Sequence, residues 1–136
     1  MCKSWRDKYK TKTQPEVRLA NFDFADVHTG EEVLVSTPAE IEAELRTLPK
    51  GTETTASELR RRLAAKHHVE VTCPITTGLF LRIIAEVALE DMAHGKPAEE
   101  VAPFWRAIPL TAPLAKKLSC GLDTLKALRR QEGLTV

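Results

Sequence analysis

The sequence predicts a mostly helical α+β domain, and three observations support this prediction. Residues 37–40 and 55–58 are capping boxes, in which a threonine caps the start of a helix and a glutamate reaches back to it. Residues 74–95 form a long segment rich in apolar side chains. The stretches between them are short and alternate in polarity, which is typical of brief strands.

Residues 1–36 show little periodicity and are predicted to form an N-terminal arm. Phe22 and Phe24 alternate with polar residues, which favours a short strand or an extended segment, and residues 33–35 are a short apolar run. The first helix should cover residues 38–48, because Thr37 is an N-cap residue and proline is favoured at the first helical position.

A turn at residues 49–51 separates this helix from a second one at 56–67, whose leucines Leu59 and Leu63 should face inward. Residues 68–71 alternate in polarity and predict a short strand or wing. A third helix, capped by Thr72, should begin at Pro74 and end near Gly95. Its wide apolar arc makes it the expected centre of the core.

Beyond the third helix we expect one helical turn at residues 97–101, a strand at 105–108 and a last amphipathic helix at 122–131. The order helix, turn, helix, short strand, helix, strand is typical of helix-turn-helix and winged-helix domains. The sequence therefore predicts a winged-helix-like domain with a short β wing and a C-terminal helix over residues 37–136.

With 136 residues, of which 43% are hydrophobic and 29% charged, the chain fits one globular domain. No apolar run reaches the roughly 20 residues of a membrane helix, and the first residues lack the apolar segment of a signal peptide. We therefore expect a cytoplasmic protein with no membrane partner.

The three cysteines, Cys2, Cys73 and Cys120, contain no Cys-x-x-Cys pair, so the sequence indicates neither a disulfide framework nor a zinc site. His67 and His68 are adjacent and would point about 100° apart on a helix. No metal or cofactor is expected. Cys73 precedes a proline at a helix start, a setting that can activate a thiol, whereas an inert buried cysteine is the commoner outcome.

Basic residues are concentrated in two segments. Residues 104–136 contain six basic and two acidic side chains, and the second helix contains Arg60, Arg61 and Arg62. This distribution favours one basic face, with ordinary solvated surface as the alternative.

Three segments in this order and spacing resemble the DNA-binding domain of the O6-alkylguanine-DNA alkyltransferases and their non-catalytic alkyltransferase-like relatives: residues 48–59, 76–82 and 103–108. The resemblance covers about residues 37–110. In that family, the residue after the proline matching Pro103 is the cysteine that accepts the alkyl group, and a histidine follows it. Phe104 and Trp105 occupy these positions here, and neither can become a nucleophile. The resemblance therefore implies a non-enzymatic binder.

The turn that leads into the second helix matches the family at Pro49, Gly51, Thr54 and Thr55. The resemblance implies that this helix start contacts the DNA backbone, because free N–H groups and the helix dipole favour an anion. The alternative is that the two threonines only cap the helix. Ala56 stands where relatives usually have a tyrosine.

The recognition helix of the family has a Val-Gly-x-Ala-Leu-Arg pattern, which residues 77–82 match without a gap at Gly78, Leu81 and Arg82. Glycine inside a helix costs about 1 kcal/mol relative to alanine, so Gly78 predicts a close approach, either of DNA or of a neighbouring helix. Ile75 stands where relatives insert an arginine into the base stack. An apolar wedge can also unstack bases.

The segment that matches the family's active site carries Phe104, Trp105 and Arg106, and these are the predicted pocket for an extruded base. Alternatively, Trp105 is an ordinary core or rim residue and Arg106 pairs with an acidic side chain. The predicted DNA-contacting residues are Thr54, Thr55, Arg60, Thr76, Thr77, Gly78, Arg82, Lys116 and Lys117.

The resemblance implies a protein that binds duplex DNA, recognises alkylated guanine by nucleotide flipping without alkyl transfer, and holds the lesion for a repair-pathway protein. The alternative is a protein-interaction or regulatory module that retains the fold but not DNA binding, which the replaced arginine and tyrosine favour. A thiol enzyme that uses Cys73 is a third, more distant hypothesis.

Overall fold

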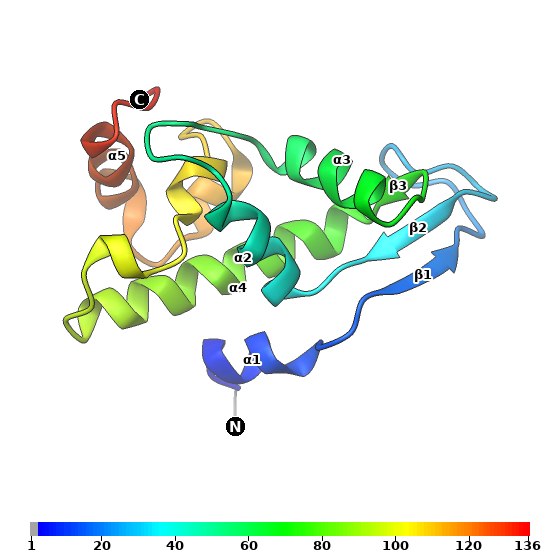
Figure 1. Cartoon of the computed structure of the whole chain (residues 1–136), viewed down its shortest axis with the longest axis horizontal. Coiled ribbons are helices and arrows are strands. Elements are labelled where there is room, and N and C mark those ends of the chain that lie inside the picture. Colours follow the sequence, from blue (N-terminus) through cyan, green and yellow to red (C-terminus); the bar gives the residue numbers. More distant parts are fainter. Residues whose placement is uncertain (1–2) are drawn as a thin grey trace.

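The computed structural model describes residues 3–136 and confirms a mainly helical α+β architecture (Figure 1). In chain order the elements are α1 (Trp5–Thr11), β1 (Glu16–Leu19), β2 (Glu32–Val35), α2 (Pro38–Arg46), α3 (Ala56–Lys66), β3 (Val71–Thr72), α4 (Pro74–Ala93), the 3-10 helices η1 (Ala98–Glu100), η2 (Phe104–Ala107) and η3 (Pro113–Lys117), and α5 (Gly121–Gln131).

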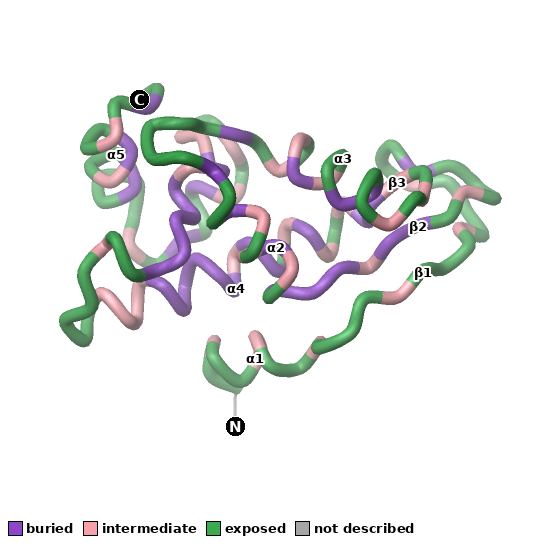
Figure 2. Tube along the Cα trace, in the orientation of Figure 1, coloured by how far each residue is buried: buried purple, intermediate pink, exposed green. Residues whose placement is uncertain are grey.

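Helix α4 is the spine of the molecule, as the sequence predicts. It is 20 residues long, and α1, α2, α3, η2 and η3 all contact it. Figure 2 shows buried residues along most of its length, among them Phe80, Leu81 and Ile84. A helix that is apolar on several sides is covered on several sides, and the remaining elements therefore surround α4.

A three-stranded sheet in the order β1-β2-β3 lies at one end of α4. Strand β2 pairs antiparallel with β1 and parallel with β3. Leu34 of β2 is fully buried in the main core, while Val33 packs with Val27 and Cys73 in a small second cluster. The predicted boundary between the N-terminal arm and the domain, at residue 36, falls between β2 and α2. Strand β2 lies before this boundary but pairs with β3, which lies after it.

The predicted helix starts at Pro38 and Pro74 are confirmed, as is the start at 56. The Thr37 hydroxyl accepts the Glu40 N–H, and the Thr55 hydroxyl accepts the Glu58 N–H. The last helix begins one residue before its predicted start, at Gly121, and ends at Gln131 as predicted.

Two predictions about local structure are wrong. The strand expected at residues 105–108 is a 3-10 helix, because its apolar residues bury several sides of the segment and do not alternate. Thr72 does not cap α4: its hydroxyl donates to the carbonyl of Arg60, and the N-cap position falls on Cys73, which makes no side-chain cap bond.

Helix α1 and strand β1 lie in the segment for which the sequence predicted only an arm. Neither element contains a fully buried residue, and in α1 only Trp5 and Tyr9 pack against the core, so the sequence pattern was too weak to predict a helix. Helix α1 is nonetheless anchored: Arg6 pairs with Asp91 at 2.6 Å, and the Tyr9 hydroxyl donates to Glu42 at 2.9 Å. Among the described residues, no helix is long and apolar enough to cross a membrane.

Because Leu34 connects the sheet to the main core, we expect Leu34→Ala to destabilise the whole chain by about 2–5 kcal/mol. The matched control is Val17→Ala, since Val17 pairs with Leu34 in the sheet but is 47% exposed; it should change the unfolding free energy by less than about 0.5 kcal/mol. Chemical denaturation followed by far-UV circular dichroism measures both. Two separate transitions in the Leu34 variant would contradict a single packed unit.

Candidate functional site

The start of α3 presents polar groups to solvent. Thr55 and Ser57 are exposed, and the first N–H groups of the helix have no intrahelical acceptor. The preceding residue holds this end in place, since the Thr54 N–H donates to the carbonyl of Arg106 at 2.7 Å. The Thr54 hydroxyl is buried and has no hydrogen-bond partner within residues 3–136. The arrangement suits an anion at the start of α3.

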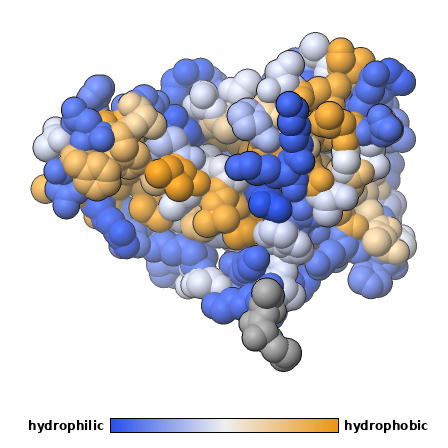
Figure 3. Space-filling model, turned by 180° about the vertical axis from the view of Figure 1, so that it is seen from behind, coloured by the Kyte–Doolittle hydropathy of each residue, from blue (hydrophilic) through white to orange (hydrophobic). Residues whose placement is uncertain are grey.

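The first turns of α4 expose an apolar face. Ile75 is 68% exposed and Leu79 is 51% exposed, one helical turn apart. Gly78 lies beside them, and a Cβ built there would meet no heavy atom within 4 Å, apart from its own helix, in the described part of the chain. A neighbouring helix therefore does not explain this glycine. Figure 3 shows hydrophobic residues gathered across the middle of the face opposite that of Figure 1.

A cavity of about 240 Å³ lies between the start of α3, the middle of α4 and the segment from η2 to η3. Most of its lining is apolar, with Thr55, Ser57 and Thr111 as the polar exceptions, and the lining residues are Thr55, Ala56, Ser57, Leu81, Ala107, Ile108, Pro109, Thr111, Ala112 and Leu114. The exposed Lys116 and Lys117 follow Leu114 in η3, and neither forms an ion pair with another described residue.

Several predicted DNA-contacting residues have structural partners. The guanidinium of Arg60 donates to Asp26 at 2.6 and 3.0 Å and to the carbonyl of Thr72 at 2.9 Å. Thr77 is buried, and its hydroxyl donates to the carbonyl of Cys73. Contacts within the fold therefore account for both Arg60 and Thr77.

Arg82 and Thr76 are less completely satisfied. The guanidinium of Arg82 lies over the ring of Trp5, with its carbon 5.2 Å from the ring centroid, and its buried Nε has no partner within the described chain. The hydroxyl of Thr76 is likewise buried without a partner there. Trp5 thus places Arg82 against α1.

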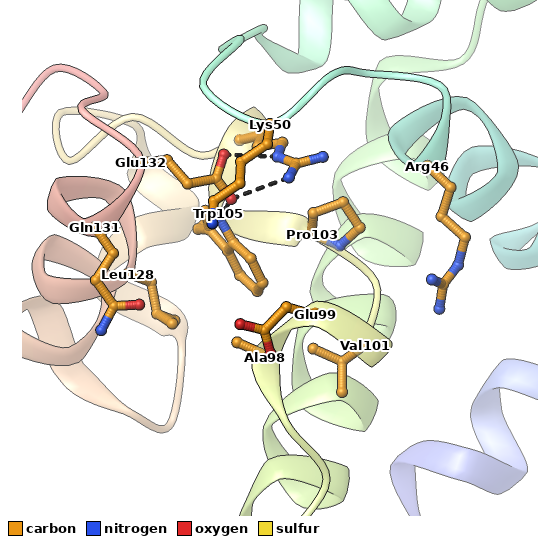
Figure 4. A pocket seen from close by; sticks show the side chains of 11 residues that line it. Arg46, Lys50, Ala98, Glu99, Val101, Pro103, Trp105, Leu128, Gln131 and Glu132 are labelled. Carbon is orange, nitrogen blue, oxygen red and sulfur yellow. Dashed lines mark hydrogen bonds and ion pairs between the residues drawn. The ribbon is translucent and has the colours of Figure 1, made fainter.

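The predicted base pocket does not form as one pocket. Phe104 is fully buried in the core, with its ring 5.2 Å from that of Trp105. Trp105 and Arg106 line a second cavity, of about 270 Å³, beside α5 (Figure 4). This cavity shares no lining residue with the one beside α3. The groups expected to hold a base by its edges instead bind the carboxylate of Glu132.

Glu132 accepts four hydrogen bonds from three residues, which lie in two segments, η2 and the turn at Gly51. It accepts the indole N–H of Trp105 at 2.8 Å and the backbone N–H of Gly51 at 2.9 Å. Arg106 donates to both carboxylate oxygens, at 2.8 and 3.0 Å, and also to the carbonyl of Leu48. The alternative prediction, that Arg106 pairs with an acid, is confirmed.

The environment of Glu132 shifts its titration. Burial raises the pKa of this carboxyl, but hydrogen bonds from Arg106, Gly51 and Trp105 lower it by more, so the folded-state pKa lies below its usual value. The carboxylate is therefore ionised at neutral pH and ties α5 to η2 and to the turn before α3.

The central role of Arg129 could not be predicted from the sequence, because a lysine- and arginine-rich last turn is ordinary for a helix. Arg129 is 1% exposed. Its guanidinium donates to the carbonyls of Trp105 at 2.7 Å and Thr135 at 2.9 Å, and to the carboxylate of Glu53 at 2.9 Å. The one signal available was its spacing from Leu125, one helical turn earlier, which places Arg129 on the same, buried face of α5.

Comparison with protein-family models, with curated proteins and with solved structures gives no match for this chain.

The lowered pKa of Glu132 predicts a specific pH dependence. A carboxyl whose folded-state pKa is depressed stabilises the fold fully above its unfolded-state pKa of about 4.3, and this contribution is lost as the pH falls through the folded-state pKa. Glu132→Gln should therefore lower the unfolding free energy at pH 7 by about 1.5–3 kcal/mol, and the difference from the wild type should shrink in acid. Urea denaturation at pH 7, 4 and 3 measures it.

Glu99→Gln is the control, because Glu99 lines the same cavity but is exposed. A difference between wild type and Glu132→Gln that stayed constant from pH 7 to pH 3 would contradict the assignment.

Proposed function

We propose that this chain is a DNA-binding protein with a winged-helix-like arrangement, in which the first turns of α4 approach the DNA and the start of α3 contacts a phosphate. The observation that carries the proposal is the open surface at Gly78. The proposal is also supported by the resemblance of residues 48–59, 76–82 and 103–108 to the alkyltransferase-like DNA-binding domain.

Glycine at position 78 lowers the stability of α4, and no contact within the described residues compensates for this. Glycine at this position makes the helix about 1 kcal/mol less stable than alanine would. A Cβ built there would have no described atom outside its own helix within 4 Å. A backbone without a side chain allows a ligand to come closer than it could to any other residue. The major groove of DNA is wide enough to admit an α-helix, and Gly78 would allow the backbone to approach it closely.

Phosphate contacts would come from two elements beside this helix. The free N–H groups at the start of α3, next to exposed Thr55 and Ser57, favour an anion through hydrogen bonds and the helix dipole. Lys116 and Lys117 are exposed on η3, which also forms a wall of the adjoining cavity. Charge contacts of this kind position a protein on DNA and make binding salt-dependent.

A flipped base would enter the cavity beside α3, not the one beside Trp105. Ile75 is exposed near the start of α4 and can act as an apolar wedge between bases, as such side chains do in proteins that kink DNA. The cavity walls supplied by Leu81, Ile108 and Leu114 are apolar and would accept the alkyl group of an O6-alkylguanine. With no thiol in this lining, the base is held and not repaired, which leaves a lesion marked for a repair-pathway protein.

The alternative proposal is a protein-interaction or regulatory module. It is favoured by exposed apolar side chains on β1 and in the loop that follows: Val17 is 47% exposed, Leu19 is 71% and Phe22 is 62%. Exposed apolar residues on an edge strand favour contact with another protein. This role requires no DNA affinity.

Gly78→Ala separates the two roles. The new methyl group should raise the unfolding free energy by about 1 kcal/mol, because alanine is the better helix former and meets no neighbour. It should also weaken binding to a short duplex at least about tenfold, because the backbone is kept away from the DNA. Denaturation and fluorescence anisotropy at two salt concentrations measure both quantities.

Lys66→Ala, at the exposed end of α3, is the control and should leave duplex binding within about twofold. Unchanged affinity in a more stable Gly78→Ala protein would overturn the proposed contact. Absence of duplex binding by the wild type, even at low salt, would leave the interaction module.

Ala112→Trp tests the assignment of the base cavity, because Ala112 lines the cavity and is only partly buried. We expect the wild type to bind a duplex with one O6-methylguanine more tightly than the unmodified duplex. A tryptophan that fills the cavity should abolish this preference and leave affinity for the unmodified duplex within about twofold. Trp105→Phe should retain the preference; loss of the preference in that variant alone would place the base in the other cavity.

A further inference from the structure

We propose that the cavity beside α5 is a second ligand site, which takes a small organic anion with a single flat ring, such as an aromatic carboxylate. The cavity of about 270 Å³ lies between α5, η1, η2 and the turn that contains Lys50. This inference is independent of DNA binding, because none of the cavity's lining residues belongs to the surface proposed to contact DNA.

One part of the cavity is apolar and suits a flat ring. Figure 4 shows Trp105 at its centre, with Leu128 of α5 on one side and Ala98 and Val101 on another. Pro103 completes this wall. Rings pack favourably on an indole in offset or edge-to-face geometry. Ligand pockets for drug-sized molecules hold about 300–1,000 Å³, so a slightly smaller cavity fits a single-ring compound.

The polar part of the cavity offers hydrogen-bond donors that the fold does not use. Lys50 is exposed and forms no ion pair within residues 3–136. Arg46 donates to Glu42 through its Nε, at 2.8 Å, and its terminal nitrogens have no hydrogen-bond partner within residues 3–136. Ammonium and guanidinium groups with free N–H bonds are suitable partners for a carboxylate.

The acidic groups of the cavity do not favour a cation instead. Both oxygens of Glu132 already accept two hydrogen bonds each, so this carboxylate has no free capacity for a ligand. Glu99 is exposed at the rim, on a three-residue 3-10 turn. Among the lining residues, the three basic side chains of Arg46, Lys50 and Arg106 outnumber these two carboxylates by one.

The protein contains its own reporter for this site. It has two tryptophans, Trp5 and Trp105, so a proton–nitrogen correlation spectrum shows two indole N–H signals, which the Trp5→Phe variant assigns. The Trp105 N–H is held by Glu132 inside the cavity wall, and a ring packed against this indole will shift its signal. The Trp5 signal is the internal control.

The experiment titrates the full chain with benzoate, benzyl alcohol and acetate. We expect benzoate to shift the Trp105 signal saturably, and benzyl alcohol and acetate, which lack the charge or the ring, to bind at least fivefold more weakly. Lys50→Gln should weaken benzoate binding about three- to fivefold, as for a partly exposed ion pair, and Ala98→Leu should abolish it by filling the cavity. Lys10→Gln, an exposed lysine on α1, is the charge-matched control and should not change it.

Lys10 and Lys50 are exposed and Ala98 is partly buried, and an unchanged Trp5 signal and melting temperature will show that the fold of each variant is intact. No saturable shift of the Trp105 signal with benzoate would overturn the proposal. Equal binding of benzoate and benzyl alcohol, or benzoate affinity that Lys50→Gln leaves unchanged, would overturn the anion specificity.

Discussion

The buried guanidinium of Arg129 holds together the segments that form both candidate sites. A charge with 1% of its surface exposed is stable only when hydrogen bonds and an opposite charge replace its water, and here three other segments supply them. Arg129 reaches the carbonyl of Trp105 in η2, the carbonyl of Thr135 in the tail and the carboxylate of Glu53, two residues before the cap of α3. The position of the α3 start therefore depends on α5, which is far from it in sequence.

Segment η2 separates two cavities with different chemistry. On one side Ala107 and Ile108 complete an apolar cavity beside the exposed Thr55 and Ser57. On the other side Trp105 and Arg106 meet Glu132 in a cavity that is also lined by Arg46 and Lys50. Arg129 and Glu132 both lie near the C-terminus, and they support the surface that we propose to contact DNA without belonging to it.

The sequence predicted the parts of the fold that local chemistry decides. The caps at Thr37 and Thr55 are correct because each depends on one hydroxyl and one N–H three residues away. Helix α1 and β1 were missed because neither buries a residue, and residues 104–107 form a 3-10 helix because burial on several sides, not alternation, governs them. Arg60, Arg106 and Arg129 each bind a partner that lies 24 to 76 residues away in the sequence, and Arg60 and Arg129 also bind carbonyls nearer in the chain. No rule of sequence spacing predicts these distant pairs. Gly78 was flagged by its helix cost, but only the structure removes the neighbouring helix as its explanation.

We propose that the start of α3, the first turns of α4 and η3 form one DNA-binding surface. To test this proposal, backbone amide signals of the ¹⁵N-labelled protein are followed as a short duplex is added at low salt. We expect shifts concentrated at residues 55–57, 75–79 and 114–117, with the Trp105 indole signal unchanged. Shifts confined to β1 and its loop, or no shift at any duplex concentration, would contradict it.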